Sequence, residues 1–465
     1  MDQNQKQRTK QLEEKKLNNF FSLRTKKSPF LKGLFFIFDF MKIQDLHSAF
    51  LANPSISTDT RKIKTNDIFF ALKGENFNGN LYAQKALDSG ASLVIIDEEK
   101  YILNQRTILV KDVLTALQEL ANFHRKYCSA KIISLTGSNG KTTTKELINA
   151  VLSKTYKTVA TKGNLNNHIG VPLTLLTIQP DTEIAIVEMG ANHLKEIEFL
   201  CKIAEPDFGY ITNFGKAHLE GFGGIEGVKK GKSELYDYLI SHKKSIFLNA
   251  DDPIQKDKLS TYTKKFGFSS EDSKYYTIKL LEAQPFVNLI VENINIETNL
   301  IGAYNFPNCC AAIIMAKYFN VELSEIKKAL EEYTPDNNRS QILDNNGNYI
   351  ILDAYNANPS SMKVALENFN SLKKDQKILI LGDMFELGES AKEEHQNISD
   401  LATSLNFEQV ILVGENFYAT NSSAVRLKSF EELKAYLVNK PTQTESSILI
   451  KGSRGMALER VLDYL

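Results

Sequence analysis

Residues 131–143 read KIISLTGSNGKTT, and this stretch decides what kind of fold the chain adopts. An apolar run, 131–135, is followed at once by a loop that contains two glycines and then by helical sequence. Glycines let backbone N–H groups approach phosphate oxygens closely, and a helix N-terminus adds partial positive charge. The stretch therefore predicts a strand–loop–helix unit of an α/β domain that binds a nucleotide phosphate.

The residues predicted to hold this phosphate are Gly137, Ser138, Asn139, Gly140, Lys141, Thr142 and Thr143. Lys141 is expected to neutralise the β and γ oxygens, and the Thr142 hydroxyl to bind Mg²⁺. The loop departs from the common G-x-x-x-x-G-K-[ST] pattern, because Leu135 stands where the first glycine is expected. The alternative is an ordinary glycine-rich turn between a strand and a helix.

Short apolar runs recur along the chain and alternate with helical sequence, which predicts α/β units with parallel sheets. With 465 residues, the chain is long enough for two to four domains. A turn-rich segment at 333–338 is a candidate linker. The expected strands are 68–72, 92–96, 131–135, 184–187, 208–211, 245–248, 349–352, 377–381, 409–413 and 447–450.

Composition narrows the class of protein. Hydrophobic residues make up 42% and charged residues 24%, as in a globular protein with a substantial core. The net charge of zero gives no global field toward nucleic acid or an anionic membrane. The four cysteines have no C-x-x-C spacing, and the apolar run 34–38 is too short for a signal peptide or membrane span. We therefore expect a cytoplasmic protein with reduced thiols.

Residues 1–40 differ from the rest. They carry nine Lys or Arg and four Asp or Glu, a net +5, which leaves −5 in 41–465. Little in 1–33 can be buried, so weak order is expected there. The segment is either an appended tail or lies upstream of a translation start at Met41. A further alternative is that 34–40 forms a short interfacial or partner-binding helix.

Three polar residues downstream of the loop are candidates for chemistry. Glu188 ends an apolar run. Its carboxylate is either a ligand of Mg²⁺ or a negative charge that stabilises the N-terminus of a following helix. His218 follows the run 208–211 and is either a metal or phosphate ligand or a structural histidine. Lys232 lies in the basic stretch 229–232, whose simplest interpretation is a solvated helix face.

Several motifs together resemble the Mur ligases, ATP-dependent amide-forming enzymes of peptidoglycan synthesis. The loop has their T-G-x-N-G-K-T form, and the resemblance covers 41–465. One departure is Thr60, which replaces a serine and keeps the hydroxyl. The other motifs, in order, are Ser57–Arg61, Gly163–Asn167, Ala217–Gly223, Asp353–Pro359, Leu381–Gly388 and Lys451–Gly455.

The resemblance implies three α/β domains: an N-terminal UDP-sugar-binding domain (41–127), a central P-loop ATPase domain (128–335) and a C-terminal Rossmann-like domain (336–465). Members of the family phosphorylate a carboxylate with ATP, and an amine then attacks the acyl phosphate. Here the implied substrates are UDP-N-acetylmuramoyl-tripeptide and D-alanyl-D-alanine. No nucleic acid or stable membrane partner is expected, and the chain is expected to be a monomer. Whether the third peptide residue is Lys or diaminopimelate stays open, as does the general base.

The resemblance also implies roles for single residues. Lys141, Glu188, His218 and Lys232 are the expected catalytic residues. Thr142 and Glu188 are expected to hold one Mg²⁺, and Glu188, His218 and a carbamylated Lys232 a second. The expected ATP-binding residues beyond the loop are Asn305, Arg339, Asp353 and Tyr355; the expected substrate-binding residues are Ser57, Arg61, Asn164, Asn166, Asn356 and Asn358.

Three of these assignments also have a structural alternative. Asn305 is placed to be a helix N-cap, Arg339 a surface charge, and 356–359 a turn. The alternative functions are those of another Mur-type ligase, a folylpolyglutamate synthase-like ligase, or a non-catalytic nucleotide-binding module. The N-terminal uridine-type domain disfavours the folate enzyme. The stretch 353–359 reads DAYNANP rather than the Asp-Asn-Pro-Arg typical of the ligase that adds the third residue.

Overall fold

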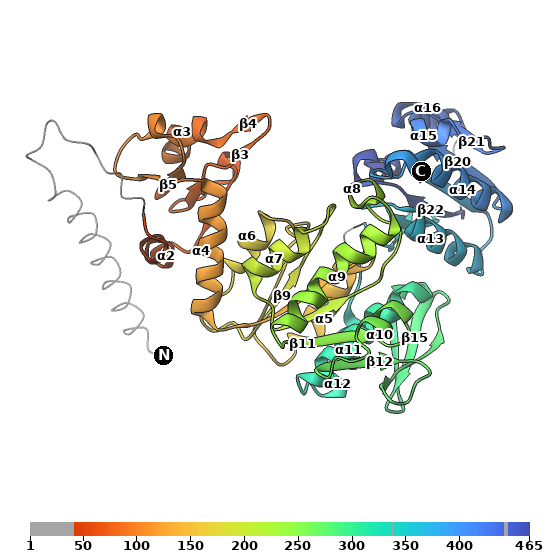
Figure 1. Cartoon of the computed structure of the whole chain (residues 1–465). Coiled ribbons are helices and arrows are strands. Elements are labelled where there is room, and N and C mark those ends of the chain that lie inside the picture. The colour runs from red at the N-terminus through yellow and green to blue at the C-terminus, as the bar shows by residue number, and fades with distance from the viewer. Residues whose placement is uncertain (1–40, 337, 441–444) are drawn as a thin grey trace, which may run out of the picture. The chain divides into compact units, whose positions relative to one another are not determined.

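The computed structural model of the chain describes residues 41–336, 338–440 and 445–465 (Figure 1). Contacts between residues divide it into two units. The first comprises the described residues up to Ala130 together with 164–185 and 202–205; the second comprises 131–163, 186–201 and 206–465. The expectations for residues 1–40 lie outside the described residues.

A four-stranded parallel sheet forms the centre of the first unit, in the order β1-β2-β5-β6. Its middle strands are buried on both faces, as their unbroken apolar sequence requires. Helix α4 packs against α2 and α6. The elements of this unit are α2 (Ile43–Ala52), β1 (Ile56–Ser57), β2 (Ile68–Phe70), β3 (Lys73–Gly74), β4 (Phe77–Asn78), α3 (Ala83–Asp88), β5 (Leu93–Ile96), β6 (Thr107–Leu109), α4 (Val113–Cys128) and α6 (Gly170–Leu175).

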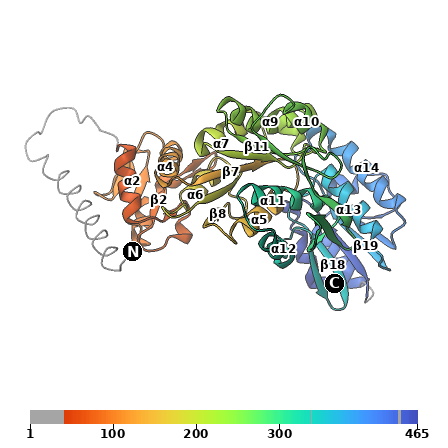
Figure 2. The ribbon, with the colours of Figure 1, turned by 90° about the horizontal axis from the view of Figure 1, so that it is seen from below.

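The first large sheet of the second unit has seven strands in the order β13-β12-β11-β10-β7-β9-β8. Helix α9 covers one face, and α5 and α11 the other (Figure 2). Its strands are β7 (Lys131–Thr136), β8 (Thr158–Ala160), β9 (Ile184–Glu188), β10 (Phe208–Ile211), β11 (Ser245–Asn249), β12 (Lys265–Ser269) and β13 (Tyr276–Thr277). Its helices are α5 (Lys141–Leu152), α7 (Glu196–Ala204), α8 (Leu219–Phe222), α9 (Ile225–Ser241), α10 (Pro253–Lys258), α11 (Phe306–Tyr318) and α12 (Leu323–Glu332).

Two further sheets complete the second unit. A three-stranded antiparallel sheet, β14-β15-β16, packs against α12. The last sheet has the order β17-β18-β22-β19-β20-β21, parallel except for the β17–β18 pair. These elements are β14 (Lys279–Glu282), β15 (Phe286–Val291), β16 (Ile294–Ile301), β17 (Gln341–Asn345), β18 (Asn348–Asp353), α13 (Pro359–Ser371), β19 (Lys377–Gly382), α14 (Ala391–Ser404), β20 (Gln409–Val413), α15 (Glu415–Tyr418), β21 (Val425–Leu427), α16 (Phe430–Asn439) and β22 (Ser447–Lys451).

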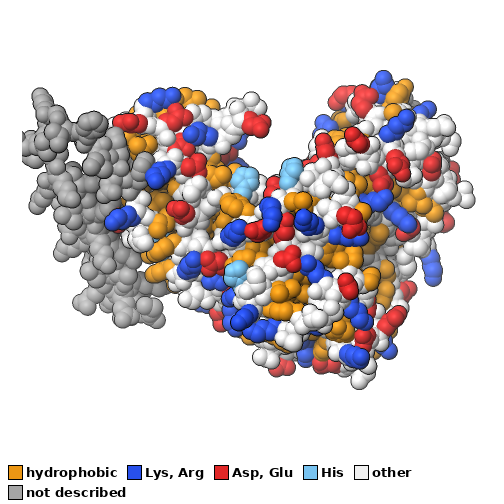
Figure 3. Space-filling model, in the orientation of Figure 1, with side chains coloured by type: hydrophobic (Ala, Val, Ile, Leu, Met, Phe, Trp, Pro, Cys, Tyr) orange, Lys and Arg blue, Asp and Glu red, His pale blue; other side chains and the backbone are white. Residues whose placement is uncertain are grey.

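The α/β class and the parallel sheets confirm the fold expected from the sequence. On the face drawn in Figure 3, basic and acidic side chains of the described residues are interspersed, in keeping with the neutral charge. None of the helices in the described ranges combines the length and apolar character that crossing a bilayer requires.

Candidate active site

The predicted phosphate-binding loop lies between β7 and α5, as the sequence predicts. Residues 137–140 and the first residues of α5 are called the phosphate loop below. Gly137 has φ +144°, and a Cβ atom there would lie 2.0 Å from Thr212 Oγ1. Gly140 has φ +76°, and a Cβ atom there would lie 2.7 Å from Asn308 Oδ1. Both positions therefore require glycine, for conformation and for space.

Residues that follow β10 hold the loop in place. Ser138 Oγ donates to the Gly215 carbonyl at 2.7 Å, and Asn139 N donates to Asn213 Oδ1 at 3.1 Å. Thr212 Oγ1 donates to the Asn139 carbonyl at 2.6 Å. Because β7 and β10 are adjacent parallel strands, these segments meet at the carboxyl edge of the sheet, where α/β proteins bind ligands.

Lys141 lies inside the loop. Its Nζ donates to the carbonyls of Gly137 at 2.7 Å and Ser138 at 3.2 Å. Burial lowers the pKa of Lys141, the Glu188 carboxylate opposes that shift, and the positive charge of Arg339 adds to it. The Lys141 ammonium thus lies near the negative charge of Glu188 and the positive charge of Arg339, at the place where the sequence predicts phosphate.

Thr142 and Glu188, the two predicted Mg²⁺ ligands, are hydrogen-bonded to each other. Thr142 Oγ1 donates to Glu188 Oε2 at 2.9 Å, and the Glu188 residue is 1% exposed. A hydroxyl and a carboxylate at this distance match the hard oxygen ligands that Mg²⁺ prefers. In the part of the chain that the structure describes, no cluster of three or more His, Cys, Asp or Glu side chains is spaced for a metal ion. The fit to Mg²⁺ therefore rests on this pair of oxygen atoms.

Lys232 is not on a solvated helix face, which corrects the simplest interpretation of its sequence. It lies on α9, is 0% exposed, and donates to the Ala191 carbonyl at 3.0 Å. Its Nζ lies 4.9 Å from the centre of the Phe222 ring. Burial, and next the positive charge of Lys141, lowers the pKa of Lys232 well below its usual value. The buried amine thus favours the neutral form.

His218 forms an ion pair with Glu386, which follows β19. Its hydrogen bond to Glu386 is the main reason why the pKa of that carboxyl is lowered. His218 has φ +52° and precedes α8. The motif Leu381–Gly388 contains Glu386, but sequence reasoning did not single this residue out, since nothing local pairs it with a histidine so distant in the chain.

Asn305 precedes α11, but its side chain makes hydrogen bonds other than a helix cap. Its Nδ2 donates to the Ile301 carbonyl at 2.9 Å, and its Oδ1 accepts from Asn308 Nδ2 at 2.8 Å. No capping hydrogen bond of the Asn305 side chain is found within the described residues, so the capping interpretation is wrong for the side chain. Asn308 Oδ1 in turn accepts from Thr144 Oγ1 at 3.0 Å, which joins α11 to α5.

Arg339 stacks on Tyr355, with its guanidinium carbon 3.7 Å from the ring centre. Its buried Nε has no hydrogen-bond partner among the described residues. A simple surface charge does not explain this placement. Asp353, which ends β18, pairs with Lys451 Nζ at 2.5 Å, and Ser340 N donates to its other oxygen at 3.2 Å. Sequence reasoning noted the motif that begins at Lys451 but missed the lysine itself.

Asn358 has two structural roles. Its Oδ1 accepts from Ser361 N at 2.9 Å and caps α13, and its Nδ2 donates to Asn139 Oδ1 at 2.7 Å. Asn358 is therefore the N-cap of α13, and in addition it contacts the phosphate loop. Asn356 Oδ1 accepts from Ala357 N at 2.9 Å in the segment that precedes α13.

The residues predicted for the nucleotide sugar all belong to the first unit. Ser57 Oγ donates to the Asp59 carbonyl at 2.9 Å. Arg61 donates to both oxygens of Asp59, at 2.9 and 2.8 Å, and its side chain is 82% exposed. That pairing lowers the pKa of Asp59 to about 2. Asn166 N donates to the Asn164 carbonyl at 2.8 Å.

Comparison with family models covers most of the described chain. The Mur ligase family catalytic domain matches 54–125, the Mur ligase middle domain 135–316, and the Mur ligase glutamate ligase domain 338–454. The matched ranges include the phosphate loop, Glu188, His218 and Lys232.

Two curated relatives carry the same name. The UDP-N-acetylmuramoyl-tripeptide–D-alanyl-D-alanine ligase of Bacillus subtilis is 34% identical and spans 91% of this chain and 97% of its own length. The enzyme of that name from Escherichia coli is 31% identical and spans 90% of this chain and 95% of its own length.

Two solved structures are also similar to this chain over most of its length. MurF from Acinetobacter baumannii is 30% identical, with a TM-score of 0.78, over 88% of this chain and 92% of that one. MurF ligase from Thermotoga maritima in complex with ADP is 25% identical, with a TM-score of 0.78, over 91% of this chain and 98% of that one.

Proposed function

The chain belongs to the Mur ligase family, and from that premise we propose that it joins D-alanyl-D-alanine to UDP-N-acetylmuramoyl-tripeptide with consumption of ATP. The observation that carries this proposal is the similarity to ligases of that name over nearly the whole chain. The loop with Lys141 and the buried Thr142–Glu188 pair supports the ATP-dependent half of the reaction. The product is the pentapeptide precursor of peptidoglycan.

The chemistry needs an activated carboxylate, because a free carboxylate does not react with an amine. The tripeptide carboxylate accepts the γ-phosphoryl group of ATP, giving an acyl phosphate and ADP. The amino group of D-alanyl-D-alanine attacks the carbonyl carbon, phosphate leaves with the C–O electron pair, and the nitrogen loses a proton. An α-amino group titrates near 8, so much of it is neutral without a dedicated base.

The chain's own residues hold and orient the phosphates. Backbone N–H groups of the loop and the start of α5 face the phosphate oxygens, and Lys141 neutralises their charge. Thr142 and Glu188 would hold Mg²⁺, which would supply positive charge against the negative charge that develops on the phosphoryl oxygens. Asn305, Arg339, Asp353 and Tyr355 are proposed to surround the rest of ATP.

Lys232 is proposed to carry a carbamate. A neutral amine attacks CO₂, a C–N bond forms, and the nitrogen releases a proton to water. Complete burial and the lowered pKa of Lys232 supply the neutral amine that this step needs. The carbamate oxygens, with Glu188 and His218, would hold a second Mg²⁺.

The proposal also includes the domain boundaries, the substrate contacts, and the oligomeric state and location of the enzyme. The domains are 41–127, 128–335 and 336–465, and the substrate contacts are Ser57, Arg61, Asn164 and Asn166 for the nucleotide sugar and Asn356 and Asn358 from the C-terminal domain. The enzyme acts as a monomer in the cytoplasm.

The test is product analysis with the purified chain, ATP, D-alanyl-D-alanine and two UDP-N-acetylmuramoyl-tripeptides that end in Lys or diaminopimelate. We expect one ADP for each molecule of a product whose mass includes the dipeptide. We also expect the enzyme to prefer one of the two tripeptides, which identifies the third residue of its natural substrate. Lys141→Ala supplies the background rate and is expected to abolish ligation. ADP formation with a folate or a single amino acid, and not with D-alanyl-D-alanine, would contradict the proposal.

A further inference from the structure

Lys73 lies at the carboxyl edge of the parallel sheet in the first unit. It begins β3, three residues after β2 ends at Phe70. Arg61 follows β1, the strand that pairs with β2. Carboxyl ends of parallel strands meet at one edge, which is where open α/β sheets bind ligands. Two basic residues therefore belong to the same edge.

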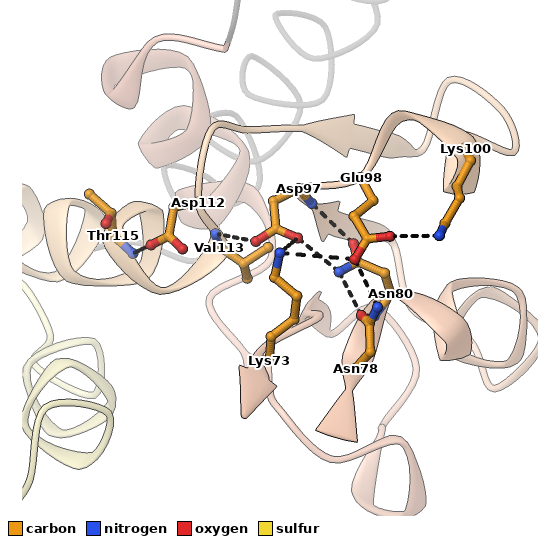
Figure 4. A network of polar contacts seen from close by, with 9 residues as sticks. All are labelled: Lys73, Asn78, Asn80, Asp97, Glu98, Lys100, Asp112, Val113 and Thr115. Carbon is orange, nitrogen blue, oxygen red and sulfur yellow. Dashed lines mark hydrogen bonds and ion pairs between the residues drawn. The ribbon is translucent and has the colours of Figure 1, made fainter. Parts of the chain in front are cut away.

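A buried carboxylate fixes Lys73. Asp97 follows β5, its side chain is 2% exposed, and its Oδ1 lies 3.1 Å from Lys73 Nζ (Figure 4). The same carboxylate accepts from Asn80 Nδ2 at 2.8 Å and from Val113 N, at the start of α4, at 3.3 Å. A helix N-terminus stabilises a carboxylate. Asp97 is therefore well satisfied by groups other than the lysine.

A second set of hydrogen bonds makes this arrangement rigid. Asn80 is fully buried, and its Oδ1 accepts from Asp97 N at 3.0 Å. Asn78 Oδ1 accepts from Asn80 Nδ2 at 2.9 Å, and Asn78 Nδ2 donates to Glu98 Oε1 at 2.8 Å. Figure 4 shows these residues converging on the Lys73 ammonium from several connecting segments.

The Lys73 side chain remains 42% exposed although its partner is buried. Fixing a long side chain costs conformational entropy, and a half-exposed ion pair contributes little stability. Two other carboxylates face this lysine: Glu98, at 3.9 Å, which Lys100 neutralises at 3.0 Å, and Asp112, which caps α4. The network thus presents an oriented, accessible ammonium.

We infer that Lys73 is a further substrate-binding residue, whose ammonium contacts the diphosphate of the nucleotide sugar beside Arg61, and that Asp97 is its positioning residue. The inference rests on the proposed function. Both basic residues are held by carboxylates, Arg61 by Asp59 and Lys73 by Asp97. Two oriented basic groups suit a diphosphate, which carries several charged oxygens.

The experiment is calorimetric titration of the full chain with UDP and, separately, with uridine. We expect Lys73→Met to weaken UDP binding about tenfold or more and to leave uridine binding within about twofold, because only UDP has the diphosphate. Lys73→Arg should retain most of the UDP affinity. Lys100→Met is the matched control, because it removes the same charge next to the same Glu98 and should change neither affinity.

In turnover, Lys73→Met should raise KM for the nucleotide substrate and leave kcat unchanged. Unchanged UDP binding, or an equal loss for UDP and uridine, overturns the inference, since the second result indicates a structural role. If the methionine variant does not fold, Lys73→Gln, whose amide can still donate to Asp97, carries the same comparison. Wild-type protein that binds neither ligand would refute the proposed function itself, a different result from any of these.

Discussion

The Thr142 hydroxyl donates a 2.9 Å hydrogen bond to the Glu188 carboxylate and so joins the first turn of α5 to the end of β9. Both residues are buried. A buried carboxylate is costly unless it is paired or binds a metal ion. The Lys141 ammonium also interacts with this carboxylate, and Mg²⁺ is the cation whose preference for hard oxygen ligands matches the hydroxyl and the carboxylate together.

Glu188→Gln tests that role with little change in shape. The amide oxygen can still accept from Thr142, so the fold should survive, while the charge that attracts Mg²⁺ is lost. We expect ADP formation to fall about 100-fold or more, since charge stabilisation by a bound metal is worth several kcal/mol. Rates measured across a Mg²⁺ titration check this. A near wild-type rate at saturating Mg²⁺ would show that Glu188 is not a ligand.

Lys232→Ala tests the carbamate. Without that anionic ligand we expect activity to fall by orders of magnitude, about 100-fold or more, and to recover in part with added acetate, whose oxygens can occupy the vacated space. Lys229→Ala is the control on the same helix, because Lys229 is paired with Glu226 at the surface. Activity of Lys232→Ala within a few-fold of wild type, without acetate, would rule the carbamate role out.

Asn358→Asp separates the two contacts of that side chain. Aspartate is a good N-cap, so α13 should keep its stability. The donor to Asn139 Oδ1 is lost, and two acceptor oxygens then face each other. We expect KM for ATP to rise several-fold with the melting temperature nearly unchanged. A lower melting temperature with unchanged KM would mean that Asn358 only caps the helix.

The buried strands could be predicted because strands covered on both faces read as continuous apolar runs. The runs 184–187, 208–211 and 245–248 correspond to β9, β10 and β11. The antiparallel strands 279–301 were missed, since β14 is exposed and β15 alternates buried with half-exposed positions. Their pattern carries a weaker local signal.

For the site, sequence identified the loop, because its glycines and lysine are adjacent in the chain. It did not identify Glu386, the partner of His218, or Lys451, the partner of Asp353. These pairs form only through tertiary structure. The partner of Lys232 is the Ala191 carbonyl, and a backbone oxygen leaves no trace in residue type.

The first unit should lose stability in mild acid through a buried histidine pair. His47 Nε2 lies 3.0 Å from His124 Nδ1, and His124 Nε2 lies 2.8 Å from the Ile178 carbonyl. His124 Nε2–H donates to that carbonyl, so its Nδ1 must accept the proton of His47, and both rings are neutral. Burial first, and then His124, lowers the pKa of His47 from 6.5 to about 4. Burial also lowers the pKa of His124.

Well above pH 6.5, as at pH 7.5, these rings are almost entirely neutral in both the folded and the unfolded state, and stability hardly depends on their protonation. As pH falls from 6.5 toward 4, the unfolded state binds protons that the folded state excludes, so the free energy of unfolding decreases by about 1–3 kcal/mol. Urea unfolding at pH 7.5 and 5.0 measures this loss. His47→Gln, whose amide can donate to His124 Nδ1 and does not titrate, should lose clearly less between the two pH values. An equal loss in both proteins would assign the acid sensitivity to other groups, because the glutamine variant removes only the titration of His47.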